Sequence, residues 1–390
     1  MLQRVVLRPP FTPAGGHAYN TPIPAEMLPK LAAGGMAVVA EDGKALGPAG
    51  ALHQHIREHG GGAFSIWGAH VYLSASDNSD CNTNGRAYSL EVIDLGDPSL
   101  RDELARNDAL LLDLVDRNRN HNNSVTGNFL GYFRVLSGHL RHHGIPMPRR
   151  ALEIGAGRRP YTALRFLAEG VELFAANDVQ RIERTLPGPF VAQLIGLLDL
   201  VDGSSADRLR SLLESAPGGD LQVRGLEILD ERPFETLQGP RDLDLVFSTS
   251  VLEHVDKPRE VVARMFDLLR PGGHAWHSID LRDHSDFARP LEFLRMTADQ
   301  YAAIGTENRL RASDWEALFA EAGFECLDRK FSTIAVGTRE AGNRVLVHSS
   351  RPPDRPWVDA AMRATFQPPF ATRDLVDLSI LGTTFLCRKP

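Results

Sequence analysis

Cysteine is scarce in this sequence, which contains 3 cysteines in 390 residues. Cys81, Cys326 and Cys387 lie far apart along the chain. A disulfide framework and a four-sulfur zinc site both need more cysteines at closer spacing, so the sequence excludes these two kinds of structural cross-link. Such sparing use of cysteine is typical of proteins in a reducing compartment.

Long apolar segments are missing as well. Residues 1–10 lack a continuous apolar core of the length found in signal peptides. The longest apolar-rich stretch, from Phe190 to Leu198, carries Gln193 and is too short to span a bilayer. We therefore expect a cytoplasmic protein that has no membrane partner.

Basic residues are outnumbered by acidic ones. The chain has 43 lysines and arginines against 50 aspartates and glutamates, a net charge of −7, and no basic run. Because a protein that neutralises many phosphates normally carries a basic stripe, we expect no nucleic-acid partner. The 43% of hydrophobic and 24% of charged residues are ordinary for a soluble protein with a sizeable core, and they exclude collagen, coiled coil and extensive disorder.

The character of the sequence changes twice along the chain and predicts three parts. Residues 1–100 hold proline and glycine punctuation around short β-forming runs and predict a small accessory α+β module. Residues 101–145 carry apolar residues at helical spacing and predict a helical linker or lid. Residues 146–390 alternate strand-like runs with helices and predict a single larger domain.

The expected accessory module has recognisable local signals. A helix is expected over 24–33, and a strand over 88–93 returns after the β-forming run 63–73, with Asn84-Gly85 as the turn signal. In the polar stretch 76–86, Asp77 and Asp80 are interpreted as turn-forming residues, with contact to a polar substrate as the alternative. The spacing of His53, His55 and His59 resembles that of a metal site, but a solvated helix face explains it more simply.

Alternation of strands and helices after residue 150 predicts the fold of the larger domain. The strand-like runs are 151–154, 173–176, 243–248, 274–281, 324–327 and 378–386. Asp256 as N-cap and Pro258 in the first turn predict one helix, and a capping box at Ser313 predicts another. The pattern favours an α/β, Rossmann-like doubly wound fold, in which helices cover a mostly parallel sheet.

A glycine loop at the end of the first strand carries the clearest functional signal. Gly155 and Gly157 follow the strand directly, and Asp178 comes 21 residues after Gly157, at the end of the second strand. Glycine lets a ligand approach the backbone, and a carboxylate at this place accepts hydrogen bonds from both hydroxyls of a ribose. Pro160 stands where a dinucleotide-binding loop has its third glycine, so the pattern favours an adenosine-type ligand without a bound pyrophosphate.

Together with three later stretches, this loop resembles class I S-adenosylmethionine-dependent methyltransferases. Residues 242–250 resemble the fourth strand of that family, residues 251–255 the turn after it, and residues 268–273 the turn before the fifth strand. The resemblance spans about residues 151–281 and implies the Rossmann-like methyltransferase fold with S-adenosylmethionine as cofactor.

The resemblance also implies which residues bind the cofactor. Glu153 would hold the loop near the methionine amino group, Asp178 would take the ribose hydroxyls, and Asp230 would approach the adenine amine. The complete implied set is Glu153, Gly155, Ala156, Gly157, Asp178, Asp230 and Ser248. Two departures from the family pattern are Arg158, which stands where many members have a small residue, and a long segment before Asp242, which predicts a helical insertion over 189–215.

The fifth strand suggests where the methyl acceptor binds. A central parallel strand is normally almost wholly apolar, yet residues 274–281 include His277 and Asp280, and His284 follows in the next loop. These three residues, with His254 after the fourth strand, are the catalytic candidates for acceptor binding or proton removal. Each candidate has an alternative interpretation: His277 could be a core histidine, and His254 could only shape the pocket. A third alternative is that His277, Asp280 and His284 bind a divalent metal, but we expect no metal.

These observations favour an S-adenosylmethionine-dependent O-methyltransferase acting on a small polar acceptor, such as a sugar or a hydroxylated natural product. A histidine-bearing pocket suits deprotonation of a hydroxyl group. The alternative is a non-catalytic cofactor- or glycan-binding protein built on a methyltransferase scaffold. A nicotinamide dehydrogenase is disfavoured by Pro160 and by the Pro271-Gly272-Gly273 turn.

Overall fold

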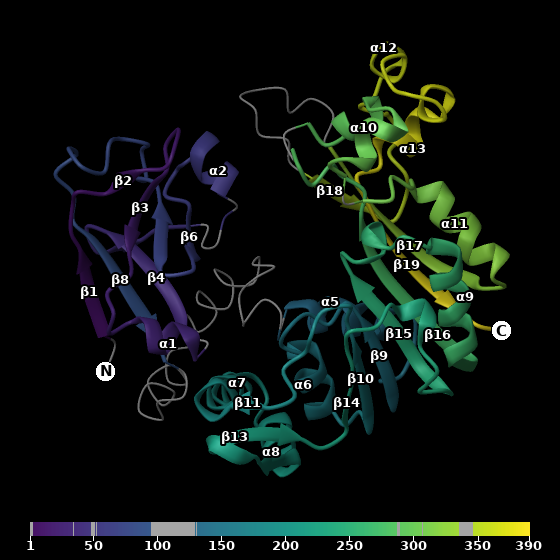
Figure 1. The fold of residues 1–390 in the computed structure, drawn as a ribbon, viewed down its shortest axis with the longest axis horizontal. Helices are drawn as coiled ribbons and strands as arrows, with labels where there is room; N and C mark the ends of the chain where they lie inside the picture. Colours follow the sequence, from purple (N-terminus) through teal and green to yellow (C-terminus); the bar gives the residue numbers. More distant parts are fainter. Residues whose placement is uncertain are drawn as a thin grey trace. The chain divides into compact units, whose positions relative to one another are not determined.

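The computed structural model describes most of the chain and divides it into two compact units (Figure 1). The described residues are 3–33, 35–47, 51, 53–94, 129, 131–286, 289–305, 307–334 and 346–390. The first unit comprises 1–147, 160–170 and 183–225, and the second comprises 148–159, 171–182 and 226–390. Most of the expected linker, 101–128, lies outside the described residues, and the three-part division stays a prediction.

An eight-stranded sheet forms the framework of the second unit. Its strands, in spatial order, are β14 (Leu226–Leu229), β10 (Leu173–Asn177), β9 (Arg150–Ile154), β15 (Leu243–Thr249), β16 (Leu269–Asp280), β19 (Gly382–Arg388), β17 (Glu325–Ile334) and β18 (Leu346–Ser349). The first five run parallel, and the last three pair antiparallel. This arrangement confirms the Rossmann-like α/β fold, because the first five strands have the 3-2-1-4-5 order of a doubly wound sheet.

The register of the parallel strands determines which loops meet. Ile154 at the end of β9 lies opposite Asn177 of β10 and Ser248 of β15. Parallel neighbours end at the same edge of a sheet, where ligands bind in this class of fold. The loops after β9, β10, β15 and β16 therefore share one edge, as the sequence pattern requires of a cofactor site.

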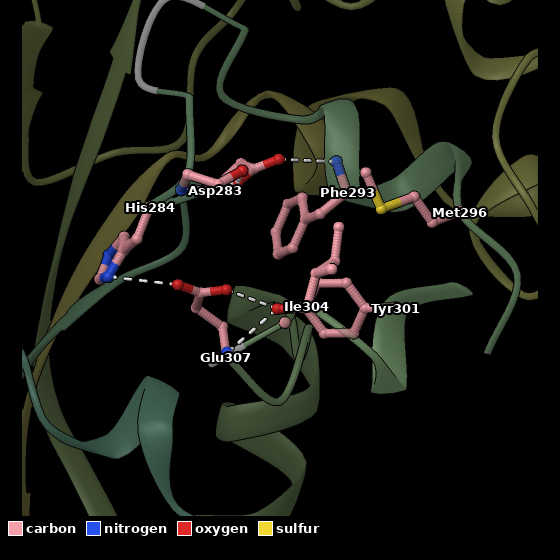
Figure 2. Close-up of a pocket in the computed structure, with 9 residues that line it drawn as sticks. Asp283, His284, Phe293, Met296, Tyr301, Ile304 and Glu307 are labelled. Atoms are coloured by element: carbon pink, nitrogen blue, oxygen red, sulfur yellow. Dashed lines mark hydrogen bonds and ion pairs between the residues drawn. The ribbon is translucent and has the colours of Figure 1, made fainter. Parts of the chain in front are cut away.

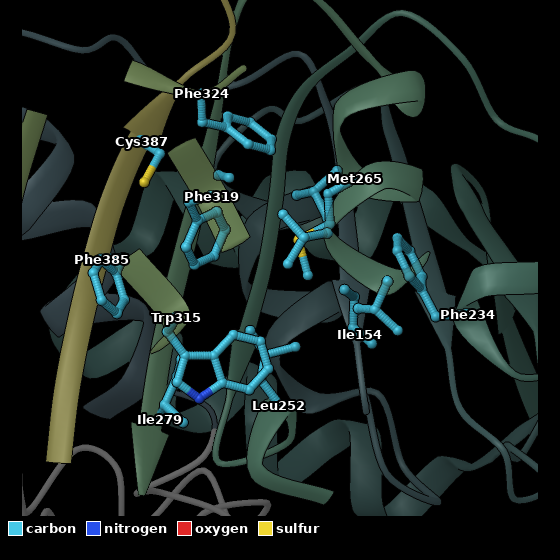
Figure 3. Packing of buried hydrophobic residues seen from close by; sticks show 14 of the residues in the cluster. Ile154, Phe234, Leu252, Met265, Ile279, Trp315, Phe319, Phe324, Phe385 and Cys387 are labelled. Carbon is cyan, nitrogen blue, oxygen red and sulfur yellow. The ribbon is translucent and has the colours of Figure 1, made fainter. Parts of the chain in front are cut away.

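A buried apolar cluster fixes the helices α9 (Pro258–Leu268) and α11 (Ala312–Glu321) against this sheet (Figure 3). Met265 of α9 and Trp315 and Phe319 of α11 pack with strand residues such as Ile154 and Phe385. Burial of each large apolar side chain contributes about 1.5–3 kcal/mol, so the cluster is a major source of stability.

The ends of several elements differ from the sequence-based prediction. The N-cap of α9 is Lys257 rather than Asp256, and the N-cap of α11 is Arg311, so the box predicted at Ser313 is wrong. Ser313 instead bonds to Asp377, which belongs to α13 (Leu375–Ser379). The strand predicted over 378–386 begins only at Gly382, because α13 occupies the preceding residues.

Arg311 explains the shifted start of α11. Its side chain is 0% exposed, and its guanidinium donates to the carbonyl oxygens of Leu281, Leu378 and Ile380, which lie next to β16 and β19. Burial lowers the pKa of Arg311 to about 10, so the group stays charged at neutral pH. A buried cation thus ties the end of the fifth parallel strand to the C-terminal segment.

The remaining elements of the second unit are short helices. They are η3 (Phe234–Thr236), η4 (Leu252–His254), η5 (Glu292–Arg295), α10 (Ala298–Ala302), α12 (Ala360–Arg363) and η6 (Phe370–Thr372). A second apolar cluster joins several of them through Phe293, Tyr301, Phe366 and Phe370. This cluster supports the loop segment between β16 and α11.

The first unit begins with two four-stranded sheets that enclose a common apolar core. One sheet contains β1 (Gln3–Leu7), β8 (Tyr88–Ile93), β4 (Met36–Glu41) and β5 (Lys44–Ala45), and the other β2 (Thr12–Pro13), β3 (Tyr19–Pro22), β7 (His70–Leu73) and β6 (Phe64–Trp67). The strand predicted at 88–93 is confirmed, but it pairs with β1 and β4 instead of the 63–73 run. That run forms its own hairpin, β6–β7.

The polar stretch 76–86 is a turn held by its own side chains. Asp77 accepts the backbone N–H of Ser79 at 3.1 Å, and Asp80 accepts that of Asn82 at 2.8 Å, which confirms both aspartates as turn formers. Helices α1 (Leu28–Ala32) and α2 (His53–Glu58) complete this region. In α2, His53 stacks on Tyr72 with ring centroids 4.0 Å apart, so this ring serves packing.

Helices make up the rest of the first unit. They are α5 (Tyr132–His142), α6 (Tyr161–Ala168), α7 (Gly188–Val201) and α8 (Gly203–Leu212). A small three-stranded sheet contains β11 (Leu186–Pro187), which precedes α7, and β12 (Leu213–Ser215) and β13 (Asp220–Val223), which follow α8 and are separated by η2 (Pro217–Gly219). The pair α7–α8 confirms the helical insertion predicted over 189–215, and Asp202 caps α8. Among the described residues, no helix combines the length and apolar character needed to cross a membrane.

Replacing Arg311 tests its role in the fold. Arg311→Met leaves three buried carbonyl oxygens without their donor, and we expect it to lower the free energy of unfolding by about 3 kcal/mol. Urea denaturation followed by circular dichroism measures this change. The exposed Arg355 provides the control, since Arg355→Met should change stability by less than about 0.5 kcal/mol. Equal stability of the two variants would contradict the assigned role.

Candidate functional site

The glycine loop after β9 is fastened to the end of β10. The backbone N–H groups of Gly155 and Ala156 donate to the carbonyl oxygen of Asn177 at 2.8 and 3.0 Å. The N–H of Gly157 donates to Oδ2 of Asp178 at 2.8 Å, and Oδ1 of Asp178 accepts the N–H of Gln180 at 2.8 Å. The structure thus brings together Gly155, Ala156, Gly157 and Asp178 at the carboxyl edge of the sheet.

The two glycines of this loop are needed for different reasons. Both have a positive φ, +74° at Gly155 and +70° at Gly157, a conformation that favours glycine. A Cβ atom at Gly155 would lie 2.3 Å from Cγ2 of Val251, so glycine allows the loop to pass the turn after β15. A Cβ atom at Gly157 would meet no described atom within 4 Å. The space beside Gly157 is therefore open to a ligand.

Asn177 and Asp230 support the loops on the adenosine side of the expected site. Asn177 Nδ2 donates to the carbonyl oxygens of Leu229 and Arg232 at 2.8 and 3.1 Å, and Asp230 Oδ2 accepts the N–H of Ile182 at 2.9 Å. Asp230 thus holds the segment after Asp178. Asn177 was not predicted, although a buried amide at the end of an apolar strand is the signal that marks it. Glu153, also expected near the cofactor, is buried in β9.

Ser248 and His277 are buried near the carboxyl ends of their strands. They are register partners on β15 and β16, both 0% exposed, and a hydrogen bond of 2.8 Å joins Ser248 Oγ and His277 Nδ1. The His277 ring stacks near Phe319, and burial lowers its pKa to about 3, so the imidazole is neutral. Both side chains are thus buried and bonded to each other, and the cofactor contact of Ser248 and the catalytic contact of His277 stay predictions.

The other catalytic candidates assemble just beyond β16. His284 Nδ1 lies 3.3 Å from Glu307 Oε1, and His284 Nε2 lies 3.6 Å from Asp280 Oδ2. Asp280 is also held by Arg282, whose Nη2 donates to Oδ2 at 2.6 Å. The exposed ring of His254 is edge-on to that of His284, with centroids 4.9 Å apart. The structure therefore brings His254, Asp280 and His284 together as predicted, without His277.

Three further members of this cluster were missed by sequence reasoning. Arg282 contacts Asp280, and Glu307 contacts His284. No motif distinguishes Glu307 in the sequence. Glu253 is 2% exposed, and its Oε1 accepts the N–H of Asp280 at 3.3 Å. Its position directly before His254, in the turn after the fourth strand, was the available signal for Glu253.

Burial and charge shift the ionisation of these groups in opposite directions. Burial raises the pKa of Glu253 to about 8, helped by the nearby charge of Asp280, so this carboxyl is largely protonated at neutral pH. Burial also acts on Asp280, but Arg282 and His284 outweigh it and lower the pKa of that carboxyl. For His284, burial favours the neutral form, yet Asp280 and Glu307 outweigh it and raise the pKa.

A cavity of about 180 Å³ opens beside His284 (Figure 2). Phe293, Met296, Tyr301 and Ile304 supply its apolar lining, and Figure 2 shows Glu307 between the His284 ring and the Tyr301 hydroxyl. The Tyr301 hydroxyl donates to Glu307 Oε2, while Glu307 N–H donates to the Tyr301 hydroxyl oxygen at 3.0 Å. The cavity is thus apolar on one side and carries a histidine–carboxylate pair on the other.

The cluster offers possible metal ligands, but not the set His277, Asp280 and His284 that the sequence suggested as an alternative. Glu253, His254 and His284 each offer one ligand atom, and these atoms lie within 4.8 Å of one another. His277 belongs to no such group among the described residues, since its ring is enclosed in the core. Metal binding by His277, Asp280 and His284 therefore does not match their arrangement.

Comparison with protein families shows to which family the chain belongs. A family model described as a methyltransferase domain matches residues 109–329, more than half of the chain. The chain belongs to this methyltransferase family. It is an S-adenosylmethionine-dependent methyltransferase, and use of this cofactor is inferred from family membership.

Solved structures with a similar fold include other methyltransferases. An S-adenosylmethionine-dependent methyltransferase from Mesorhizobium loti is 15% identical, with 64% of this chain and 96% of that chain covered and a TM-score of 0.33. The N-methyltransferase NodS from Bradyrhizobium japonicum, in complex with S-adenosyl-L-homocysteine, is 11% identical, with 72% and 98% covered and a TM-score of 0.34. A search of curated protein sequences finds no significant match.

The raised pKa of Glu253 predicts how the stability of the methyltransferase depends on pH. A carboxyl whose pKa is higher in the folded than in the unfolded state stabilises the fold fully only below its unfolded pKa, near 4.5, and the stability is lost as pH rises toward 8. Glu253→Gln removes this ionisation while keeping the shape. We expect the variant to gain on the order of 2–3 kcal/mol relative to the wild type between pH 5 and pH 8.

Urea denaturation at a series of pH values measures this difference between Glu253→Gln and the wild type. The exposed Glu260 on α9 is the control, since Glu260→Gln should leave the pH dependence unchanged. Parallel stability curves for Glu253→Gln and the wild type would show that Glu253 ionises normally in the folded protein.

Proposed function

We propose that this methyltransferase binds S-adenosylmethionine against the loop Gly155–Gly157, with Asp178 on the ribose, and methylates a hydroxyl group of a small acceptor held in the cavity beside His284. The observation that carries the proposal is the hydrogen bond between Gly157 and Asp178. This hydrogen bond connects two parts of the proposed site at the carboxyl edge of the sheet. One is the loop that the cofactor approaches, and the other is the carboxylate proposed to bind the ribose.

The described residues fit an adenosyl cofactor. Each oxygen of the Asp178 carboxylate accepts one backbone N–H, and each retains capacity to accept a hydroxyl hydrogen, as the two hydroxyls of a ribose require. The partly exposed position of Asp178 and the open space beside Gly157 leave room for the sugar. Glu153 and Asp230 are proposed to act at the two ends of the same site, as supports for the loop and for the segment after Asp178.

His284 is proposed as the proton acceptor. S-adenosylmethionine supplies a methyl group bound to a positively charged sulfur, and an in-line displacement requires an aligned, electron-rich acceptor atom. Neutral His284 would take the proton of the acceptor hydroxyl, and Glu307 and Asp280 would orient the ring and stabilise its charged form. His254 would border the same space. His277 is inferred to be a core histidine that stabilises the sheet.

The lining of the cavity favours one acceptor class. Phe293, Met296 and Ile304 offer apolar contact surface but no hydrogen-bonding groups for a ring of sugar hydroxyls. A hydroxylated natural product, with an apolar body on these side chains and one hydroxyl near His284, matches both sides of the cavity. The proposed partner is thus a small molecule.

Cofactor binding is tested by calorimetry with S-adenosylmethionine and S-adenosylhomocysteine. Asp178→Ala removes charge-assisted hydrogen bonds to the ribose, so we expect affinity to fall about 10- to 100-fold. Asp354→Ala, at an exposed carboxylate, is the control and should leave affinity unchanged. Equal cofactor affinity of Asp178→Ala and the wild type would refute the proposed ribose contact.

Proton transfer by His284 is tested through pH dependence. Because Glu307 and Asp280 raise the pKa of His284 above its usual 6.5, the neutral form should be lost, and turnover with it, as pH falls through that raised value. Glu307→Gln removes a negative charge, so the acidic limb of kcat/KM should move to lower pH, and His284→Gln should abolish the limb and lower kcat at least about tenfold.

Turnover of labelled S-adenosylmethionine with a panel of phenols, alcohols and sugars measures these profiles, and NMR titration of the His284 ring reports its pKa independently of turnover. Glu260→Gln again serves as the control. A wild-type profile that persists in His284→Gln would exclude His284 as the base, whereas cofactor binding without turnover on the entire panel would favour the non-catalytic alternative.

A further inference from the structure

Cys326 and Cys387 are widely separated in the sequence but directly opposite each other in the sheet. They are register partners on the antiparallel strands β17 and β19. Cα atoms of such partners lie about 4.5 or 5.5 Å apart, within the range of about 4.4–6.8 Å found across disulfides, and their side chains project from the same face. The two thiols interact, with Cys387 as the donor toward Cys326, and the Cys326 thiol itself donates to the carbonyl oxygen of Asp328 at 3.6 Å.

The two thiols differ in access and in acidity. Cys326 is exposed, whereas Cys387 is buried beside Phe319, Phe324 and Phe385 in the core cluster shown in Figure 3. The hydrogen bond from Cys387 lowers the pKa of Cys326 and, with Arg329 nearby, outweighs the effect of burial. A reagent from solvent therefore meets Cys326, the more acidic of the two thiols, with Cys387 directly opposite it, which is the arrangement of an attacking and a resolving cysteine.

We propose that Cys326 and Cys387 form a dithiol that low-molecular-weight disulfides, such as glutathione disulfide, oxidise reversibly to an intramolecular disulfide bond. The Cys326 thiolate attacks one sulfur of the small disulfide, forms a mixed disulfide and releases one small thiolate. Cys387 then loses its proton to solvent and attacks Cys326 Sγ, which releases the second small thiolate. The protein dithiol is oxidised by two electrons, and the small disulfide is reduced to two thiols.

The raised pKa of Cys387 does not block the second step. The pKa is raised first because Cys387 donates its hydrogen bond to the Cys326 sulfur, and then by burial and by the charge on that sulfur. In the mixed disulfide Cys326 carries no negative charge, so this electrostatic contribution disappears when Cys387 has to ionise. Arg329 favours thiolate formation at Cys326, whereas Asp328 and Glu316, the ion-pair partner of Arg329, oppose it.

The bond would close a covalent ring around the C-terminal part of the chain. The ring would include α12, α13 and the strands β17, β18 and β19, together with Phe366 and Phe370 of the second apolar cluster. Cross-linking a long segment restricts the unfolded chain, so the oxidised protein should unfold at a higher temperature than the reduced protein, by several degrees. This site is independent of the proposed cofactor and acceptor contacts.

The full chain, first reduced, is equilibrated in glutathione buffers of increasing disulfide content, quenched with acid, labelled with a maleimide and analysed by intact mass and peptide mapping. We expect two of its three thiols to become protected together, with the loss of two hydrogen atoms and a linked peptide that joins Cys326 to Cys387, while Cys81 still takes the label. Dithiothreitol should restore both thiols.

Single substitutions separate the two steps. Cys387→Ser should accumulate a stable glutathione adduct on Cys326, and Cys326→Ser should resist oxidation at the same potential, while Cys81→Ser should behave as the wild type. Cys387→Ala provides a second test if the buried serine prevents folding. A stable glutathione adduct on wild-type Cys326, or three labelled thiols in buffers that oxidise dithiothreitol, would overturn the proposal.

Discussion

The hydrogen bond from Gly157 to Asp178 is the interaction on which the functional interpretation depends. It exists because β9 and β10 are parallel neighbours that end in register, so the loop after one strand meets the residue that follows the other. Asn177 adds further hydrogen bonds at the same junction, through its carbonyl oxygen to the loop and through its side chain to the segment after β14. The edge proposed for the cofactor is therefore organised largely by backbone hydrogen bonds.

Buried polar groups elsewhere in the second unit stabilise the sheet on which this edge is built. Ser248 and His277 bond to each other between β15 and β16, and Arg311 supplies hydrogen bonds to carbonyl oxygens beside β16 and β19. A buried polar group without a partner costs about 1–3 kcal/mol, so each of these hydrogen bonds avoids such a cost. The acceptor cluster differs from them, because His284 and Glu307 border a cavity while Glu253 behind them favours its neutral form.

Sequence reasoning predicted the loop edge that we propose for the cofactor, but only part of the cluster beside the cavity. The glycine loop and Asp178 are found by short-range spacing, since strand, loop, helix and strand follow one another in the chain. The burial of His277 was not predicted, because the polar content of residues 274–281 indicates an unusual strand but does not say which face each side chain occupies. Glu307 and Arg311 come from the segment after α10, and no local pattern connects them to β16.

The sequence by itself determined the alternation of strands and helices, the glycine loop, the carboxylate at Asp178 and the family, because these depend on local spacing and on the order of elements. Only the tertiary structure decided which polar side chains meet. It turned Ser248 and His277 into the core, placed Glu307 on His284 and set Cys326 against Cys387. The physical reason is that strand register and side-chain packing join residues remote in the chain, and neither is encoded in the spacing of a single segment.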